Sequence, residues 1–209
     1  MEDLWFRPLI WIDYRLALLF NLIIPIILTI WAFARQMDAI GRLLVIYWRV
    51  ASLLIITVYL MAPGWLGENT PFQAFSGQMG FVTLLAARIL IPISLWFWLD
   101  LNDEIKDLPP SFLKLVLTSW RWAVTVYSSL GAMVDVPFLS CAVSRSTLET
   151  PFCQVWLQVP VGYWSIVHQD ATPGFLGFLG LLGLSIYVLY LAYFLLVRLG
   201  KQGRSALEQ

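Results

Sequence analysis

Five apolar runs, each close to the length of a membrane-spanning helix, restrict this chain to one class of fold. They fall at about residues 16–34, 43–62, 80–99, 112–133 and 175–197. A helix needs about 20 apolar residues to cross the hydrocarbon core of a bilayer, and there it must satisfy its backbone hydrogen bonds internally. Of all residues, 60% are hydrophobic and only 12% are charged. We therefore predict an all-α helical transmembrane bundle of about five spans, forming a single integral-membrane domain over residues 1–209.

The segments outside these runs carry few features that point to chemistry. Residues 1–14 combine Trp5, Trp11 and Tyr14 with charged residues, a pattern typical of a short segment lying in the membrane interface before the first span. The longest segment outside the spans, residues 135–173, contains the only histidine, His168, which we expect on the loop surface. One histidine and two cysteines do not make a zinc site, so we predict no metal.

The basic residues predict the orientation in the membrane. Five spans place the chain ends on opposite faces, and lysine and arginine concentrate on the cytoplasmic face. One face would carry Arg35, Arg42, Lys106, Lys114, Arg198, Lys201 and Arg204, and the other only Arg7, Arg15 and Arg145. We therefore place the carboxyl terminus in the cytoplasm and the amino terminus in the lumen or periplasm.

This orientation puts the loop between spans four and five on the non-cytoplasmic side. Its two cysteines, Cys141 and Cys153, would then lie in a compartment where a disulfide persists. Two unpaired thiols and a redox switch are the alternatives.

Three arginines, Arg49, Arg88 and Arg121, interrupt the apolar runs and are the strongest functional signal in the sequence. Charge at the bilayer centre costs about 2.5–3.5 kcal/mol on insertion scales, so each needs a partner, a hydrated cavity or a route to the headgroups. Arg49 and Arg121 lie about two turns from the cytoplasmic end of their spans, so their side chains can extend to the headgroups. Contacts with lipid or a partner protein, and a substrate path, are the alternatives.

Arg88 presents the harder problem because it lies near the middle of its predicted span. No acidic residue falls inside any predicted span, and Asp100 is about 18 Å further along the helix axis. We expect its partners to be Asn21, backbone carbonyls freed by Pro25 or Pro92, an anionic lipid or another subunit.

Glycines recur at every third position of the fifth run, at Gly174, Gly177, Gly180 and Gly183. A helix face without side chains permits close approach of another helix or of a flat ring. Gly177 and Gly180 are therefore predicted to contact either the chain's own helices or an external protein or pigment.

Several motifs of enzymes are missing from the sequence. It has no glycine-rich nucleotide loop, no His-Glu-x-x-His and no serine in a nucleophile-elbow setting. Acidic and basic residues balance, which gives no reason to expect binding to nucleic acid. We therefore expect a protein that is not an enzyme; an enzyme of lipid or pigment metabolism is a remote alternative.

Four segments, residues 47–52, 87–98, 118–127 and 198–205, resemble an uncharacterised family of polytopic membrane proteins from cyanobacteria, a domain of unknown function. The resemblance covers nearly the whole chain and supplies no catalytic residues. It implies a cyanobacterial membrane, the thylakoid in particular, where many small polytopic proteins assist the assembly of photosynthetic complexes.

The predicted function is therefore that of a non-enzymatic assembly or auxiliary factor for a photosynthetic complex. Bound chlorophyll or carotenoid is compatible with it, but no histidine lies in a span, so ligation of chlorophyll would fall to Asn21, a carbonyl or water. The alternative is a small transporter or lipid-handling protein that uses Arg49, Arg88 and Arg121 as an anion path.

Overall fold

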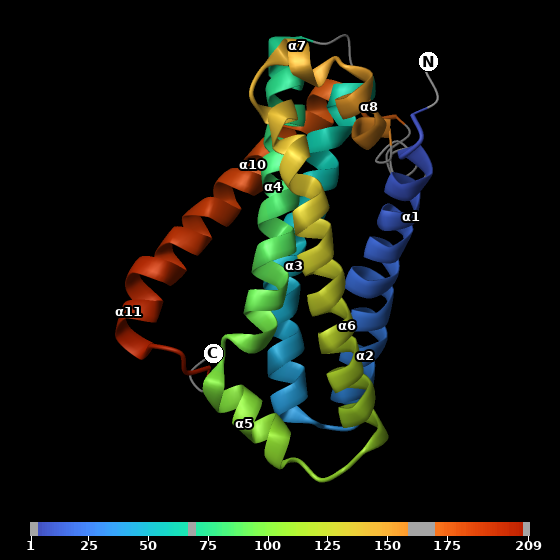
Figure 1. Ribbon diagram of the computed structural model, residues 1–209. Helices are drawn as coiled ribbons and strands as arrows, with labels where there is room; N and C mark the ends of the chain where they lie inside the picture. Colours follow the sequence, from blue (N-terminus) through green and yellow to red (C-terminus); the bar gives the residue numbers. More distant parts are fainter. Residues whose placement is uncertain (1–3, 67–69, 159–169, 207–209) are drawn as a thin grey trace.

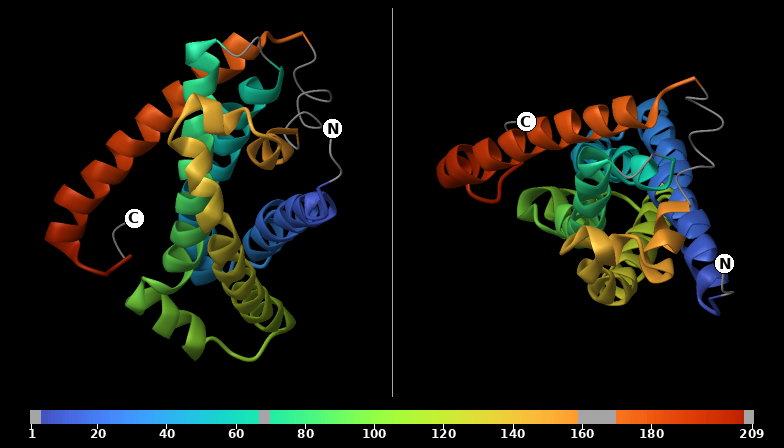
Figure 2. Two further views of the ribbon diagram at one scale, coloured as in Figure 1. Left: turned by 45° about the horizontal axis from the view of Figure 1, so that its top comes forward. Right: turned by 90° about the horizontal axis from the view of Figure 1, so that it is seen from above.

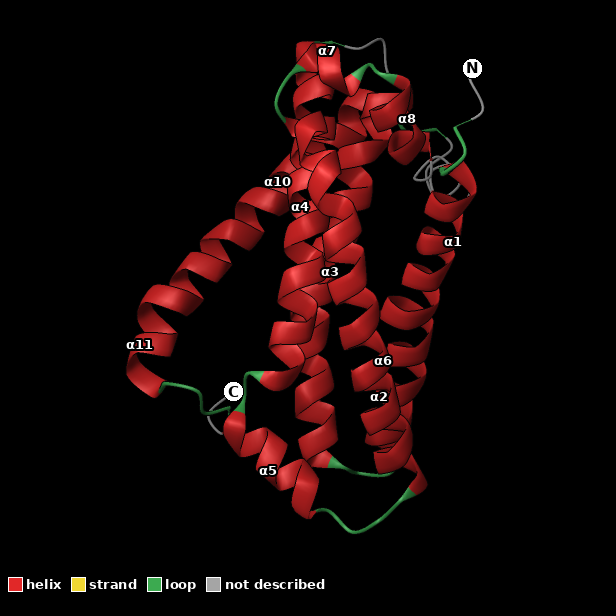
Figure 3. Cartoon of the chain, in the orientation of Figure 1, coloured by secondary structure: helices red, strands yellow, loops and turns green. Residues whose placement is uncertain are grey.

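The computed structural model describes residues 4–66, 70–158 and 170–206, and within these ranges every regular element is a helix (Figures 1 and 3). His168 lies outside the described residues. Five helices are long and apolar enough to cross a membrane, which confirms the predicted all-α fold and its five spans. They run over Arg7–Ala34, Asp38–Gly64, Pro71–Trp96, Phe112–Ala142 and Pro173–Lys201.

The first span is a single long helix built from α1 (Arg7–Leu18), η1 (Leu19–Ile23) and α2 (Ile24–Ala34). It begins at Arg7, which corrects the expectation of a separate interfacial segment before residue 16. The element η1 is a turn of π-helix, in which the Ile24 N–H bonds to the Leu19 carbonyl, and the following Pro25 has no N–H to donate.

The irregular turn exposes two backbone carbonyls of the first span to neighbouring helices. The Trp120 indole N–H donates to Phe20 O at 2.8 Å, and the Tyr47 hydroxyl donates to Asn21 O at 2.7 Å. The turn thus ties the first span to α3 (Asp38–Leu66) and to α6 (Phe112–Asp135).

The centre of the bundle is the antiparallel pair α3 and α4 (Pro71–Trp96), with α6 packed against α4 (Figure 1). Glycine lets the pair approach closely at Gly80, where a Cβ would lie 2.5 Å from the Met61 Cγ and 3.4 Å from the Met61 backbone nitrogen on α3. Thr70 and Gln73 form a capping box, with each side chain accepting from the backbone N–H of the other, and this starts α4.

One end of the bundle carries α5 (Leu99–Asp107). The third span was predicted to reach residue 99, but α4 ends at Trp96. Trp98 is extended, with φ −85° and ψ 105°, and this breaks the helix between α4 and α5. The acidic segment is thus a short helix, held to α3 by the Arg42–Glu104 ion pair at 2.5 Å.

The other end is capped by η2 (Val136–Ala142), α7 (Arg145–Leu148) and α8 (Pro151–Gln158). The last span consists of α10 (Pro173–Tyr193), η3 (Phe194–Arg198) and α11 (Leu199–Gln202). It leaves the bundle at an angle and diverges from α3 and α4 toward the end that carries α5 (Figures 1 and 2).

Candidate functional site

Arg88 on α4 is neutralised by two carboxylates from other helices. Its Nη2 bonds to Asp13 on α1, and its Nε lies 3.3 Å from an oxygen of Asp135 on α6. The side chains of Arg88 and Asp135 are only 4% and 3% exposed, whereas that of Asp13 is 25% exposed. This corrects the expectation that no acidic residue reaches the depth of Arg88, because the first and fourth helices extend beyond their apolar runs.

One face of α6 supports this cluster with residues four positions apart, Tyr127, Gly131 and Asp135, which share a helix face. The Tyr127 hydroxyl lies 2.9 Å from both the carbonyl oxygen and a carboxylate oxygen of Asp13. The centre of the Tyr127 ring lies 4.6 Å from the guanidinium carbon of Arg88. A Cβ on Gly131 would lie 2.6 Å from that carbon, so a larger residue would displace the guanidinium from its present position. The spacing of these residues was the signal in the sequence that could have revealed the site.

A cavity of about 240 Å³ adjoins the cluster, between the first helix and α3, α4 and α6. Its walls are mainly apolar side chains, among them Leu18, Leu22, Leu54, Ile55, Val58 and Leu84. The Asp13 and Arg88 side chains line one part of it, and Trp156 of the capping helix α8 contributes another.

Several buried polar atoms of the cavity lining have no hydrogen-bond partner among the described residues. They are Arg88 Nη1, Ser128 Oγ, Trp156 Nε1 and Asn21 Oδ1. Buried polar groups are nearly always hydrogen-bonded, so such a concentration in one cavity requires an explanation. All four atoms belong to residues that line the cavity, and the first three are hydrogen-bond donors.

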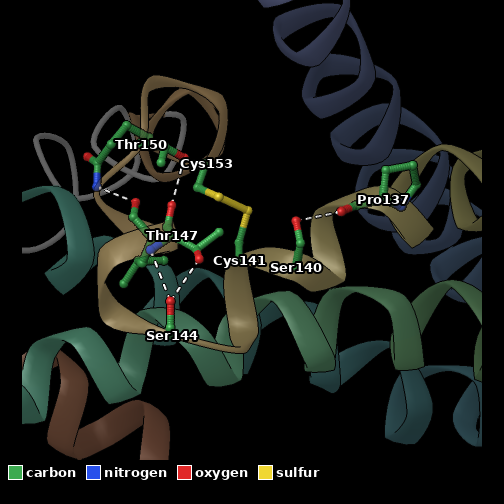
Figure 4. The surroundings of a disulfide bond; sticks show 9 residues. Pro137, Ser140, Cys141, Ser144, Thr147, Thr150 and Cys153 are labelled. Atoms are coloured by element: carbon green, nitrogen blue, oxygen red, sulfur yellow. Dashed lines mark hydrogen bonds between the residues drawn. A yellow bond between two sulfur atoms is a disulfide. The ribbon is translucent and has the colours of Figure 1, made fainter.

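The disulfide holds in place the helix that brings Trp156 to this cavity. Cys141 of η2 and Cys153 of α8 are bonded, with their Cα atoms 5.8 Å apart and both side chains fully buried (Figure 4). Aromatic side chains surround the bridge, and the rings of Phe138 and Phe152 stack at 4.4 Å. The bridge thus fixes α8 to η2, the segment that continues α6.

Arg121 on α6 binds backbone and amide oxygens instead of reaching the headgroups. Its Nη2 donates to Leu95 O at 2.6 Å and to Asn102 Oδ1 at 2.5 Å, and its guanidinium lies 4.0 Å from the Trp96 ring centre. The last carbonyls of a helix lack intrahelical partners and carry partial negative charge, so the end of α4 attracts a cation. Only 4% of Arg121 is exposed. The expected extension of its side chain to the headgroups is therefore wrong.

Arg49 differs from both, because its side chain is exposed and its contact with Tyr190 is weak. Its Nη1 lies 3.5 Å from the Tyr190 hydroxyl on α10, which is the outer limit for a hydrogen bond. Among the described residues no carboxylate forms an ion pair with it.

The glycines of α10 face the chain's own helices. A Cβ on Gly180 would lie 2.9 Å from the backbone nitrogen of Leu60 on α3, and one on Gly177 would lie 3.3 Å from Pro63 and Ser76. Gly177 and Gly180 are therefore covered within the chain and offer no open face to an external protein or pigment.

Five apolar helices around a buried ion cluster define a polytopic helical integral membrane protein. The chain belongs to the family described as "Protein of unknown function (DUF3177)", which matches residues 7–207. No curated protein and no solved structure matches it.

Proposed function

We propose that this protein binds a small apolar molecule with an uncharged, hydrogen-bond-accepting group in the cavity beside Arg88. The observation that carries the proposal is that four residues lining an otherwise apolar cavity each hold a buried polar atom without a partner among the described residues. Ligand sites typically combine apolar walls with a few convergent polar groups. The proposal therefore favours a role in lipid handling.

The charge of the cluster selects the kind of polar group. Arg88 faces two carboxylates, so the fully ionised cluster carries one net negative charge and repels an anion. The unpaired Nη1 of Arg88, with the Ser128 hydroxyl and the Trp156 indole N–H, favours a neutral acceptor such as a ketone, ester or quinone carbonyl. For the same reason an anion path through Arg49, Arg88 and Arg121 gains no support.

The size of the cavity selects the shape of the ligand. Its volume of about 240 Å³ lies below the range of about 300–1,000 Å³ for sites that enclose drug-sized molecules. A macrocycle such as chlorophyll exceeds this space, whereas the end group of an isoprenoid quinone or keto-carotenoid fits it.

The test uses decylubiquinone as the neutral probe and dodecyl phosphate as the anionic one. Trp48 and Trp156 line the cavity, so quinone binding quenches tryptophan fluorescence of the purified protein in detergent. We expect saturable quenching by decylubiquinone that dodecyl phosphate does not reverse.

A cavity-filling variant provides the matched control. Ala17 lines the cavity, and Ala17→Phe should weaken quinone binding by about tenfold, or 1.4 kcal/mol, while Ala34→Phe at an exposed position of α2 should not. Equal binding to both variants, or displacement of the quinone by dodecyl phosphate, would refute the proposal.

A second candidate function is the assembly or auxiliary factor of a photosynthetic complex in the thylakoid. The last span favours it, because only 6% of its most apolar window is buried within the chain, against 44% and 50% for the spans of α3 and α4. Isolation of a tagged copy from native membranes in mild detergent, with mass spectrometry and an absorption spectrum, tests it. Photosystem or cytochrome subunits in the eluate would support this function, and a solitary colourless protein would contradict it.

The proposed orientation keeps α5 and the carboxyl-terminal tail in the cytoplasm. It rests on the basic residues at that end of the bundle, including Arg42, Lys106 and Lys201.

A further inference from the structure

The divergence of α10 from the bundle follows from the distribution of its residues. Glycines bring one end into close contact with α3, as at Gly180, where a Cβ would meet the Leu60 backbone. The other end carries Tyr187, Tyr190 and Phe194 on the side facing α3 and α4, and these aromatic rings hold the helices apart. The result is a wedge that opens toward α5 (Figures 1 and 2).

The open part of the wedge is a narrow apolar groove. It has a volume of about 150 Å³ and is bounded by Ile46 and Val50 of α3, by Leu90 and Ile93 of α4, and by Leu191 and its neighbours on the last span. Such a volume suits one flexible hydrocarbon chain better than a rigid helix, which is about 10 Å across with its side chains.

The chain itself closes the wide end of the wedge. After α11 the tail returns to the end of α4, where Arg204 Nε donates to Phe97 O at 2.8 Å and its guanidinium stacks on the Phe97 ring. The Ala206 N–H donates to Asp100 at 2.6 Å, which anchors the tail on α5. These contacts hold the last span at its angle, so the groove is a built feature of the fold.

Two guanidinium groups line the groove from opposite walls, Arg49 from α3 and Arg198 from the end of η3. Among the described residues, the guanidinium of Arg49 has only its long contact with the Tyr190 hydroxyl. Glu104, which lines an adjoining cavity together with Arg49, is already paired with Arg42. Glu104 is therefore not available to balance the charge of Arg49 beside the apolar groove.

We infer that this wedge binds an anionic membrane lipid, with an acyl chain in the apolar groove and the phosphate between Arg49 and Arg198. Guanidinium groups bind phosphate oxygens with paired, charge-assisted hydrogen bonds, and basic pockets between membrane helices recognise acidic headgroups. Tyr190 and Trp98, also in the groove, belong to the residue types that concentrate at the headgroup level. The bound lipid would fill the space that the diverging helices leave.

Native mass spectrometry of the purified protein tests this inference, with phosphatidylglycerol and phosphatidylcholine of identical acyl chains as probes. We expect one phosphatidylglycerol to remain bound under conditions that remove phosphatidylcholine. The double variant Arg49→Gln/Arg198→Gln should weaken phosphatidylglycerol binding by about tenfold or more, and Arg49→Lys/Arg198→Lys should retain most of it.

Arg145→Gln is the matched control, because Arg145 is exposed and pairs with Glu149 in the capping region at the other end of the bundle. It should leave lipid binding unchanged, as should Ala17→Phe in the cavity beside Arg88, so the two proposals fail separately. Equal retention of the two lipids by the unaltered protein would mean ordinary surface lipid and would overturn the inference. Full phosphatidylglycerol binding by the double glutamine variant would overturn it as well.

Discussion

Replacement of Arg88 by glutamine should destabilise the protein by about 3–5 kcal/mol, the usual cost of removing one partner of a buried ion pair. The structure points to the upper part of this range for the contact with Asp135, because both side chains are almost fully buried. Asp135 Oδ1 already lacks a partner among the described residues, so the loss of Arg88 would strip the carboxylate of its remaining stabilising contact. Asp13 suffers less, since it is partly exposed and keeps the Tyr127 hydroxyl.

Removal of the Asp135 charge together with Arg88 should recover part of the lost stability. If the unpaired charge of Asp135 causes the loss, Arg88→Gln/Asp135→Asn should be more stable than Arg88→Gln alone. Contacting residues in one ion network show coupling of about 0.5–3 kcal/mol, and we expect a value near the top of that range. Unfolding in mixed micelles with increasing sodium dodecyl sulfate, followed by tryptophan fluorescence, gives the four free energies of the cycle.

The exposed pair Arg145 and Glu149 supplies the comparison, with side chains 49% and 45% exposed. Arg145→Gln should cost no more than about 1 kcal/mol. If Arg88→Gln costs as little as this control, the cluster is not a buried ion pair. The same conclusion would follow if the destabilisation of the double variant equalled the sum of those of Arg88→Gln and Asp135→Asn.

Two further predictions concern packing and the cap. Gly180→Ala should destabilise the protein by about 1–3 kcal/mol, because the new methyl would meet the Leu60 backbone. Gly174→Ala, where a Cβ would meet no atom within 4 Å, should be neutral or stabilising. Thermal unfolding of both variants in detergent measures the difference. Replacing both Cys141 and Cys153 by serine should cost about 3 kcal/mol and weaken quinone binding, because the bridge positions α8; reduction of the unaltered protein should reproduce both effects, and an unchanged melting curve would contradict the prediction.

The spans were predictable because each apolar run is long enough to identify a membrane helix without tertiary information. The ends of the helices were not. The charged residues of segment 1–14, Asp13 among them, favoured an interfacial position over the first span, since an isolated carboxylate in hydrocarbon is unfavourable. The partner of Asp13, Arg88, is 75 residues away in the sequence, and only the packing of α1 against α4 and α6 makes the longer helix acceptable.

The arginines illustrate a second limit of the sequence. The depth of Arg121 in its span suggested that it reaches the headgroups, but α4 ends at Trp96 directly beside it and offers the Leu95 carbonyl. Where α4 ends depends on the extended conformation at Trp98 and on Asn102, which donates to the Trp96 carbonyl at 3.0 Å. Such a helix end is set by contacts between segments, which residue spacing in one span does not reveal.

The three arginines satisfy the same physical requirement with different partners, and the difference decides what each can bind. Arg121 Nη2 is bonded to oxygens of the chain itself, and Arg88, whose charge is balanced by two carboxylates, keeps Nη1 without a partner among the described residues. Arg49 alone retains both exposure and a charge without an ion pair among the described residues. A neutral acceptor at Arg88 and an anion at Arg49 follow from this distribution. Decylubiquinone should therefore not compete with phosphatidylglycerol for the groove at Arg49, and phosphatidylglycerol should not displace decylubiquinone from the cavity beside Arg88.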